Sequence, residues 1–224
     1  MIVGERKNLD EIKDMIRPYG KVLVAGCDTC TAECMAGGRK QVAELAAALD
    51  MAFSLEGKEM EITETTVDRQ CIHEFLLDVI DQAEKVDAIV SIACGAGVQS
   101  LAERLPGKPI FPGINTTFLA ETASMGLWQE RCRGCGDCVL GSTAGLCPVT
   151  RCAKSLLNGP CGGSQNGLCE VSASLKCEVP CVWAMIYDRL AQMGELDRLT
   201  DYCPPKDWRP SGMMGPRQMV RGDH

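Results

Sequence analysis

Short apolar runs of strand length alternate with segments of helical periodicity through the first half of the chain. Strands are predicted at residues 21–26, 60–65, 87–93 and 108–115, and helices at 8–17, in the second half of 32–53, at 69–84 and at 98–105. Strands that alternate with helices of this length form a parallel sheet covered on both faces. The pattern therefore predicts an α/β fold, with a small parallel-sheet domain of the Rossmann or flavodoxin type over residues 1–118.

The second half of the chain loses this periodicity. Between residues 132 and 163, glycine and proline interrupt every apolar run. Such a segment buries too little apolar area to offset the entropy that it loses on ordering. Helical spacing returns over 178–199, where Val182, Ile186 and Leu190 fall on one face. We expect a cysteine-rich, loop-dominated domain with a C-terminal helix over 119–203, followed over 204–224 by a tail that docks a partner or is flexible.

Cysteine is the exceptional residue, with fifteen copies against two histidines. The chain starts MIVGERKNLDE, without an apolar signal segment, and no run approaches the roughly 18 apolar residues of a membrane span. We therefore expect a cytoplasmic protein, in which thiols at short fixed spacings favour metal binding over a disulfide framework. A net charge of −7, with five basic and five acidic residues over 119–181, argues against nucleic acid as a partner.

Four cysteines are placed where a parallel sheet collects its ligands. Cys27 follows the strand 21–26 and begins the pattern C-x2-C-x3-C with Cys30 and Cys34, while Cys94 follows the strand 87–93. Because ligands bind at the carboxyl ends of parallel strands, we predict that these four thiols share a metal site. Burial as small apolar side chains is the alternative, and for Cys94 alone it is equally strong. Cys71 and His73, on the predicted helix 69–84, are expected to be structural or surface residues.

The cysteine spacing in the second half favours iron–sulfur clusters. The run C-R-G-C-G-D-C over 132–138 has the spacing of the first three ligands of a bacterial [4Fe–4S] loop. Cys147-Pro148 is similar to the ferredoxin ending, but eight residues separate it from Cys138 instead of three, so the pairing of thiols stays open. We expect two or three [4Fe–4S] clusters, with zinc at one site as an alternative. The predicted metal-binding residues are Cys27, Cys30, Cys34, Cys94, Cys132, Cys135, Cys138, Cys147, Cys152, Cys161, Cys169 and Cys181.

Three motifs in order carry a family resemblance. They are the CxxCGxC run at 132–138, CPVTRC at 147–152 and LLNGPCGG at 156–163. Together they closely resemble the iron–sulfur small subunit of the two-subunit methylenetetrahydrofolate reductases of acetogenic and related anaerobic bacteria. GCDTCTAECMAGG at 26–38 and ACGAG at 93–97 are also similar to that family, so the resemblance extends over nearly the whole chain.

The resemblance implies a non-catalytic electron-transfer subunit. Its partner would be a larger TIM-barrel flavoprotein, which carries the only FMN and reduces methylenetetrahydrofolate to methyltetrahydrofolate. Ferredoxin or a further subunit would supply the electrons. Two other hypotheses remain, namely a structural zinc-binding scaffold or regulatory subunit of the same kind of complex, and a stand-alone enzyme that uses a cluster as a Lewis acid.

Overall fold

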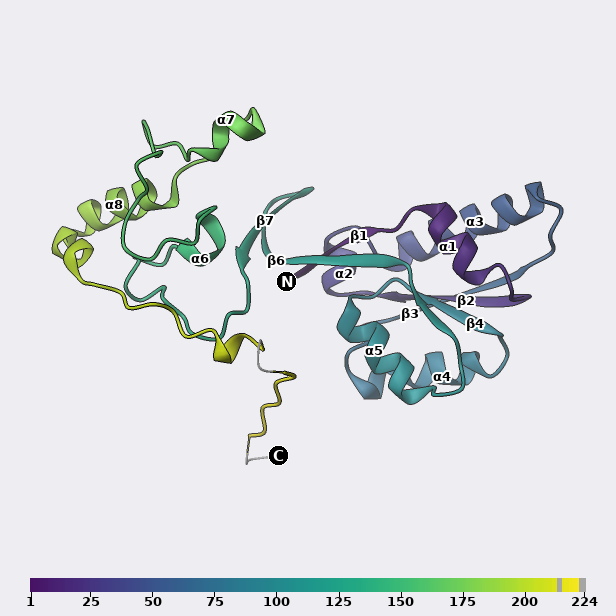
Figure 1. Ribbon diagram of the computed structural model, residues 1–224. Coiled ribbons are helices and arrows are strands. Elements are labelled where there is room, and N and C mark those ends of the chain that lie inside the picture. The colour runs from purple at the N-terminus through teal and green to yellow at the C-terminus, as the bar shows by residue number, and fades with distance from the viewer. Residues whose placement is uncertain (213–214, 222–224) are drawn as a thin grey trace. The chain divides into compact units, whose positions relative to one another are not determined.

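The computed structural model describes residues 1–212 and 215–221, and it divides into two compact units. Unit 1 is Met1–Trp128 and unit 2 is Gln129–His224 (Figure 1). The boundary that we expected at residue 118 falls inside strand β6 (Ile114–Ser124). Part of the expected tail over 204–224, at residues 213–214 and 222–224, lies outside the described residues.

Unit 1 is built on a four-stranded parallel sheet in the order β3-β2-β4-β5. Its strands are β2 (Lys21–Cys27), β3 (Glu61–Val67), β4 (Ala88–Ser91) and β5 (Ile110–Pro112). Counted among themselves, the parallel strands follow the order 2-1-3-4, which is the beginning of the flavodoxin-like order. The mixed α/β fold predicted from the sequence is confirmed.

Helices cover both faces of this sheet. On one face lie α1 (Leu9–Ile16) and α3 (Arg39–Leu55), and on the other lie α4 (Leu77–Ala83), with the 3-10 turn η1 (His73–Leu76) before it, and α5 (Gly95–Arg104) (Figure 1). Alternate residues of β2 enter the two layers: Val22 and Val24 belong to the first core, and Leu23 to the second. This two-sided burial is the reason that the strand reads as a continuous apolar run.

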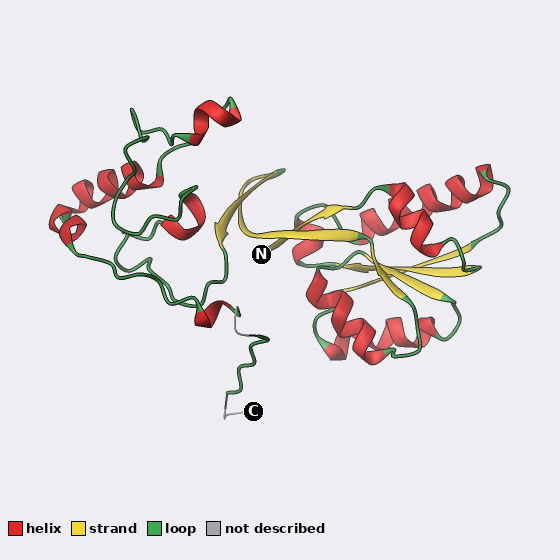
Figure 2. Cartoon of the chain, viewed as in Figure 1, coloured by secondary structure: helices red, strands yellow, loops and turns green. Residues whose placement is uncertain are grey.

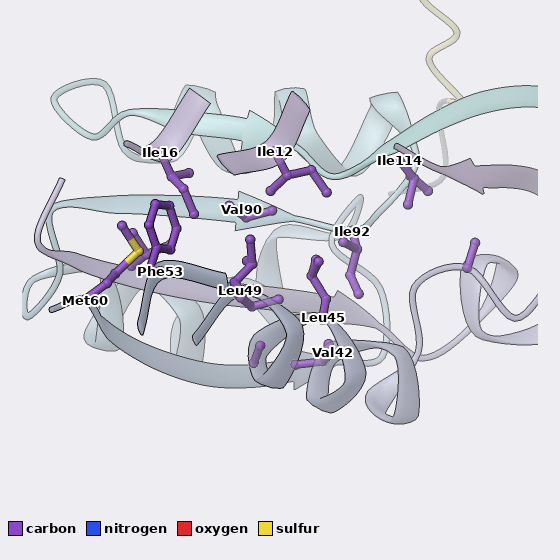
Figure 3. Packing of buried hydrophobic residues seen from close by; sticks show 14 of the residues in the cluster. Ile12, Ile16, Val42, Leu45, Leu49, Phe53, Met60, Val90, Ile92 and Ile114 are labelled. Atoms are coloured by element: carbon purple, nitrogen blue, oxygen red, sulfur yellow. The ribbon is translucent and has the colours of Figure 1, made fainter. Parts of the chain in front are cut away.

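The larger core lies between β2, β4 and the helices α1 and α3. Ile12 and Ile16 of α1 face Leu49 and Phe53 of α3 across this layer, and all four side chains are fully buried (Figure 3). Burying a side chain of this size stabilises a fold by roughly 1.5–3 kcal/mol. Helix α1 can begin at Leu9 because the side chain of Asn8 accepts a hydrogen bond from the Asp10 amide at 2.9 Å.

A second sheet, which the sequence pattern did not predict, has the strand order β1-β6-β7. Strand β1 (Ile2–Arg6) pairs antiparallel with β6, and β7 spans Leu127–Cys132. We predicted one strand over 108–115, but the structure has β5 and β6 separated by Gly113. A side chain at Gly113 would clash with Ile92, because its Cβ would lie 2.6 Å from Ile92 Cγ2.

Unit 2 consists mainly of loops, as the glycine-rich sequence predicted (Figure 2). Its regular elements are α6 (Pro148–Arg151), α7 (Val171–Leu175), α8 (Val182–Met193), η2 (Leu196–Thr200) and η3 (Arg209–Ser211). The helix expected over 178–199 is therefore shorter and ends where Gly194 adopts a left-handed conformation with φ 72°. The core of this unit is small and gathers around α8, at Val182, Trp183, Ile186 and Leu190.

The helix predicted over 69–84 is wrong at its beginning. Residues 68–72 form an irregular turn, and the helical conformation starts only with η1 at His73. The change matters for the site, because Cys71 lies in this turn instead of on a helix. None of the helices within residues 1–212 and 215–221 has the length and apolar composition needed to cross a bilayer.

Candidate metal centres

The carboxyl ends of adjacent strands bring the thiols of unit 1 to one edge of the sheet. Cys27 is the last residue of β2, Cys30 is the first residue of the single-turn helix α2 (Cys30–Glu33), and Cys94 is the N-cap of α5 directly after β4. Strands β2 and β4 pair in parallel, so both ends lie on the same side. This is the point where the strand order reverses, the usual ligand-binding position in an open α/β sheet.

The turn that follows β3 reaches the same edge. Its residue Gln70 is fully buried and donates hydrogen bonds from Nε2 to the carbonyls of Ala25 at 3.0 Å and Gly26 at 2.9 Å. The hydroxyl of Ser91 donates to Gln70 Oε1 at 2.7 Å. Gln70 therefore connects the end of β2 with the end of β4, and Cys71 is the next residue along the chain.

Cys71 interacts electrostatically with three other thiols of unit 1. Burial raises the pKa of the Cys71 thiol, and the negative charges of Cys94, Cys27 and Cys30 raise this pKa further. Mutual repulsion between thiolates raises a pKa in this way only at short range, because surface charges are screened beyond about 10 Å. The thiols that act on the pKa of Cys71 in this way are Cys94, Cys27 and Cys30.

Cys34, which we also predicted as a ligand, is the C-cap of α2, and its amide donates to the Cys30 carbonyl at 3.2 Å. It is only 6% exposed and belongs to the larger apolar core. Its Sγ accepts a hydrogen bond from the amide of Gly4 at 3.4 Å and donates to the Thr31 carbonyl at 3.6 Å. Gly4 is part of β1, the strand that the sequence did not predict, so the surroundings of Cys34 could not be anticipated. These contacts favour the alternative given for these cysteines from the sequence, namely burial as a small apolar side chain.

In unit 2, a tight loop carries the first three thiols. Cys132 ends β7, and the amide of Gly134 donates to Cys132 Sγ at 3.3 Å. The Cys135 thiol donates to the carbonyl of Asp137 at 3.7 Å, a local contact between residues two apart in the loop. Amide hydrogen bonds to sulfur are a means by which iron–sulfur proteins tune their clusters.

The short helix α6 places two further thiols at its ends. Cys147 is its N-cap, with its thiol donating to Thr150 Oγ1 at 3.6 Å, and Cys152 is its C-cap. Cys152 also packs against the small apolar core around α8. The two thiols of the CPVTRC motif are therefore separated by one helical turn that is anchored to the core.

Cys161 lies beside an ion pair. Its thiol donates to Glu170 Oε2 at 3.6 Å, and Lys154 Nζ lies 2.5 Å from Glu170 Oε1. The hydrogen bond with Glu170 raises the pKa of Lys154 despite its partial burial, and the charges of Cys161 and Cys152 contribute to this rise. Lys154 thus brings a positive charge near two of the predicted ligands.

Backbone pairing brings the last two predicted ligands into neighbouring segments. The amide of Cys169 donates to the Val179 carbonyl at 2.8 Å, and the amide of Cys181 donates to the Gly167 carbonyl at 2.8 Å. Cys181 is also the buried N-cap of α8, so its position is fixed by the core of unit 2. Cys177 is exposed in the loop between them.

The described side chains do not form a closed site for a single metal ion. Within residues 1–212 and 215–221, no three cysteine, histidine, aspartate or glutamate side chains are arranged to hold one metal ion. A tetrahedral zinc ion with metal–sulfur bonds of about 2.3 Å draws its thiolates to within about 3.8 Å of one another. A [4Fe–4S] cube takes one thiolate at each iron, so its thiolates lie further apart.

A hollow of about 840 Å³ at the opposite, amino end of the sheet lies away from these thiols. It is lined in part by Lys21, Glu61 and Asp87. Lys21 pairs with Glu61 at 2.7 Å, and the amides of Lys21 and Gly20 donate to the Asp87 carboxylate, which lowers the pKa of Asp87. These charges hold strand ends together. His73, exposed as expected, contacts Arg104 through Nδ1.

Comparison with known proteins gives one match. The model of a family described as "Methylene-tetrahydrofolate reductase C terminal" matches residues 111–209, somewhat less than half of the chain. The matched segment contains all the predicted ligands of unit 2. No match was found among curated proteins or among solved structures. Residues 111–209 are thus related to the C-terminal part of methylenetetrahydrofolate reductases.

Proposed function

We propose that this chain is the iron–sulfur electron-transfer subunit of a methylenetetrahydrofolate reductase complex. The observation that carries the proposal is the match over 111–209 to a reductase C-terminal family, in a segment that contains eight of the predicted thiolate ligands. The fold of unit 1 adds a second group of thiols at the usual ligand-binding edge of its sheet. The partner is a flavoprotein that binds FMN and the folate.

Reduction of methylenetetrahydrofolate to methyltetrahydrofolate consumes two electrons and two protons. Iron–sulfur clusters, when bound, supply one-electron transfer. The residues of this chain hold the thiolates, place Lys154 near Cys152 and Cys161, and keep Cys181 at the buried end of α8. A reduced ferredoxin-like donor supplies the electrons, and the flavin of the partner passes them to the folate as a pair.

Anaerobic metal and acid-labile sulfide analysis tests the cofactor. We expect roughly eight to twelve irons per chain with an equal amount of sulfide, as two or three cubanes require. Zinc without sulfide would contradict electron transfer and leave a structural zinc scaffold as the function.

A ligand variant tests the site within unit 2. Cys135→Ser is expected to lose about four irons and four sulfides, one cubane's content. The matched control is Cys177→Ser, at an exposed cysteine of the same unit that is not among the predicted ligands. Unchanged iron in Cys135→Ser would contradict the assignment.

Activity tests the partner. The chain alone should not reduce methylenetetrahydrofolate with a chemical electron donor. Adding the flavoprotein should restore turnover, and adding it with Cys135→Ser in place of the natural chain should restore less. Turnover by this chain alone would overturn the proposal.

A further inference from the structure

The turn 68–72 presents an exposed cysteine at the edge of the sheet where ligands collect. Cys71 is exposed, although its neighbour Gln70 is fully buried and tied to the ends of β2 and β4. An exposed residue gains little from apolar packing, so the usual structural explanation of a cysteine is weak here, although the thiol is partly desolvated. A loop that is rigidly anchored and displays one thiol is suited to hold a ligand in place.

Contacts with the segment 27–29 also fix the position of this turn. The hydroxyl of Thr29 donates to the carbonyl of Asp68 at 3.0 Å, and the Cys27 thiol donates to the same carbonyl at 3.6 Å. The turn is therefore attached to the segment that carries Cys27 and Cys30. A hydrogen bond from the Asp28 amide to the Val67 carbonyl at 2.9 Å connects the same two segments one residue earlier.

The first turn of helix α5 also packs closely against this turn. A Cβ placed on Gly97 would lie 2.9 Å from Gln70 Cβ and 3.7 Å from the amide nitrogen of Cys71. Only glycine permits the turn to approach the first turn of α5 this closely. Cys94, the N-cap of that helix, precedes Gly97 by three residues.

We propose that Cys71 is the fourth thiolate of the unit 1 metal centre, which then consists of Cys27, Cys30, Cys71 and Cys94. The four residues come from three adjacent strand ends, whereas Cys34 is committed to the core beside β1. Cys30 and Cys94 are partly exposed and Cys71 is exposed, so each thiol is free to change its χ1 rotamer as the group binds. The inference deepens the proposed function, since it assigns the ligands of one of its clusters.

The sharpest test compares Cys71→Ala with Cys34→Ala in the full-length chain purified without oxygen. Cys71 is exposed, so its truncation leaves the fold intact, while truncation of Cys34 removes one buried sulfur. Iron, zinc and sulfide are counted per chain, and the cysteines that remain open to alkylation are identified by mass spectrometry. Circular dichroism verifies that both variants are folded.

We expect Cys71→Ala to lose about four irons and four sulfides, and to leave Cys27, Cys30 and Cys94 open to alkylation. Cys34→Ala should keep the metal content of the natural chain. If Cys71→Ala keeps its metal, or if Cys34→Ala is the variant that loses it, the inference is overturned while the proposed function stands.

The zinc content distinguishes the proposed electron-transfer function from the proposed ligand set. A natural chain with zinc and no sulfide would end the electron-transfer function. Loss of one zinc in Cys71→Ala but not in Cys34→Ala would then still establish the ligand set. A natural chain that holds no metal and whose four thiols alkylate freely would overturn both.

Discussion

The ammonium group of Lys206 lies 3.2 Å from Oδ2 of Asp137, although only 2% of the Lys206 side chain is exposed. Burial lowers the pKa of Lys206, but the hydrogen bond to Asp137 and the charge of Cys135 outweigh it and raise this pKa overall. Lys206 is therefore a charged side chain enclosed beside one of the predicted cluster ligands. The segment after residue 203, part of the expected tail, therefore contacts the loop 132–138.

Two other contacts attach this segment to the same loop. A Cβ on Gly136 would lie 2.6 Å from the carbonyl oxygen of Pro210, and the φ of Gly136 is +81°. The guanidinium of Arg217 donates to the Gly134 carbonyl at 3.3 Å. The described residues of the tail thus contact the loop, while Cys132 and Cys138 stay exposed.

Replacing Lys206 by methionine should lower the reduction potential of the cluster proposed at Cys132, Cys135 and Cys138. A cubane gains negative charge on reduction, and a nearby cation favours the reduced state. Loss of the bond to the half-exposed Asp137 should also cost roughly 1 kcal/mol in the free energy of unfolding. Potentiometry followed by electron paramagnetic resonance measures the shift. Arg189→Met, on the exposed face of α8, is the control, and equal potentials in the two variants would refute the effect.

Metal removal should affect the two units differently. Unit 1 has two extensive cores on either side of its sheet, whereas the core of unit 2 is confined to the surroundings of α8. Thiolate–metal bonds must then supply much of the order in unit 2. After oxidative chelation of iron, we expect the amides of Cys169 and Cys181 to lose protection from hydrogen exchange, while those of Leu23 and Ile89 keep it. Continued protection of Cys169 and Cys181 would argue that the loops fold without metal.

Trp183 anchors the unit 2 core to the loop before Cys161. Its Nε1 donates to the Leu156 carbonyl at 3.0 Å, and the residue is 6% exposed. Trp183→Phe leaves that carbonyl without its donor and removes part of the ring, which should cost about 1–3 kcal/mol. Urea unfolding of the metal-loaded chain measures the loss. Tyr187→Phe, on the same helix at 51% exposure, should change the midpoint little; comparable losses would show that the contact with Leu156 is unimportant.

Glu56 should make stability depend on pH in acid. Hydrogen bonds from Arg17 at 2.7 Å and Lys13 at 2.6 Å lower the pKa of Glu56 to about 2 from an ordinary value of 4.5. The folded-state pKa is the lower one, so the stabilisation is fully present above pH 4.5 and is lost as the pH falls from there through about 2. Glu56→Gln should reduce the loss of stability within this window. An NMR titration of Glu56 with a midpoint near 4.5 would contradict the expectation.

The sequence by itself determined the alternation of strands and helices in unit 1 and the irregular character of unit 2. Apolar runs such as 22–25 are buried on both faces of the sheet, so their composition alone identifies them as parallel strands. Placing Cys27 and Cys94 at one edge also needed only the sequence, because both cysteines directly follow strands and the ends of parallel strands meet.

The tertiary structure adds the surroundings of Cys34 and Cys71, which local spacing could not supply. Cys34 has the spacing of a ligand, but its environment depends on β1, which pairs with β6 at the other end of unit 1. The apolar pattern of 69–84 predicted a helix that included Cys71. In the structure, buried hydrogen bonds from Gln70 hold residues 68–72 in a turn, and the apolar pattern does not predict these bonds. The spacing of cysteines along the chain indicates which residues are candidate ligands. Contacts between distant segments fix the position and surroundings of each side chain.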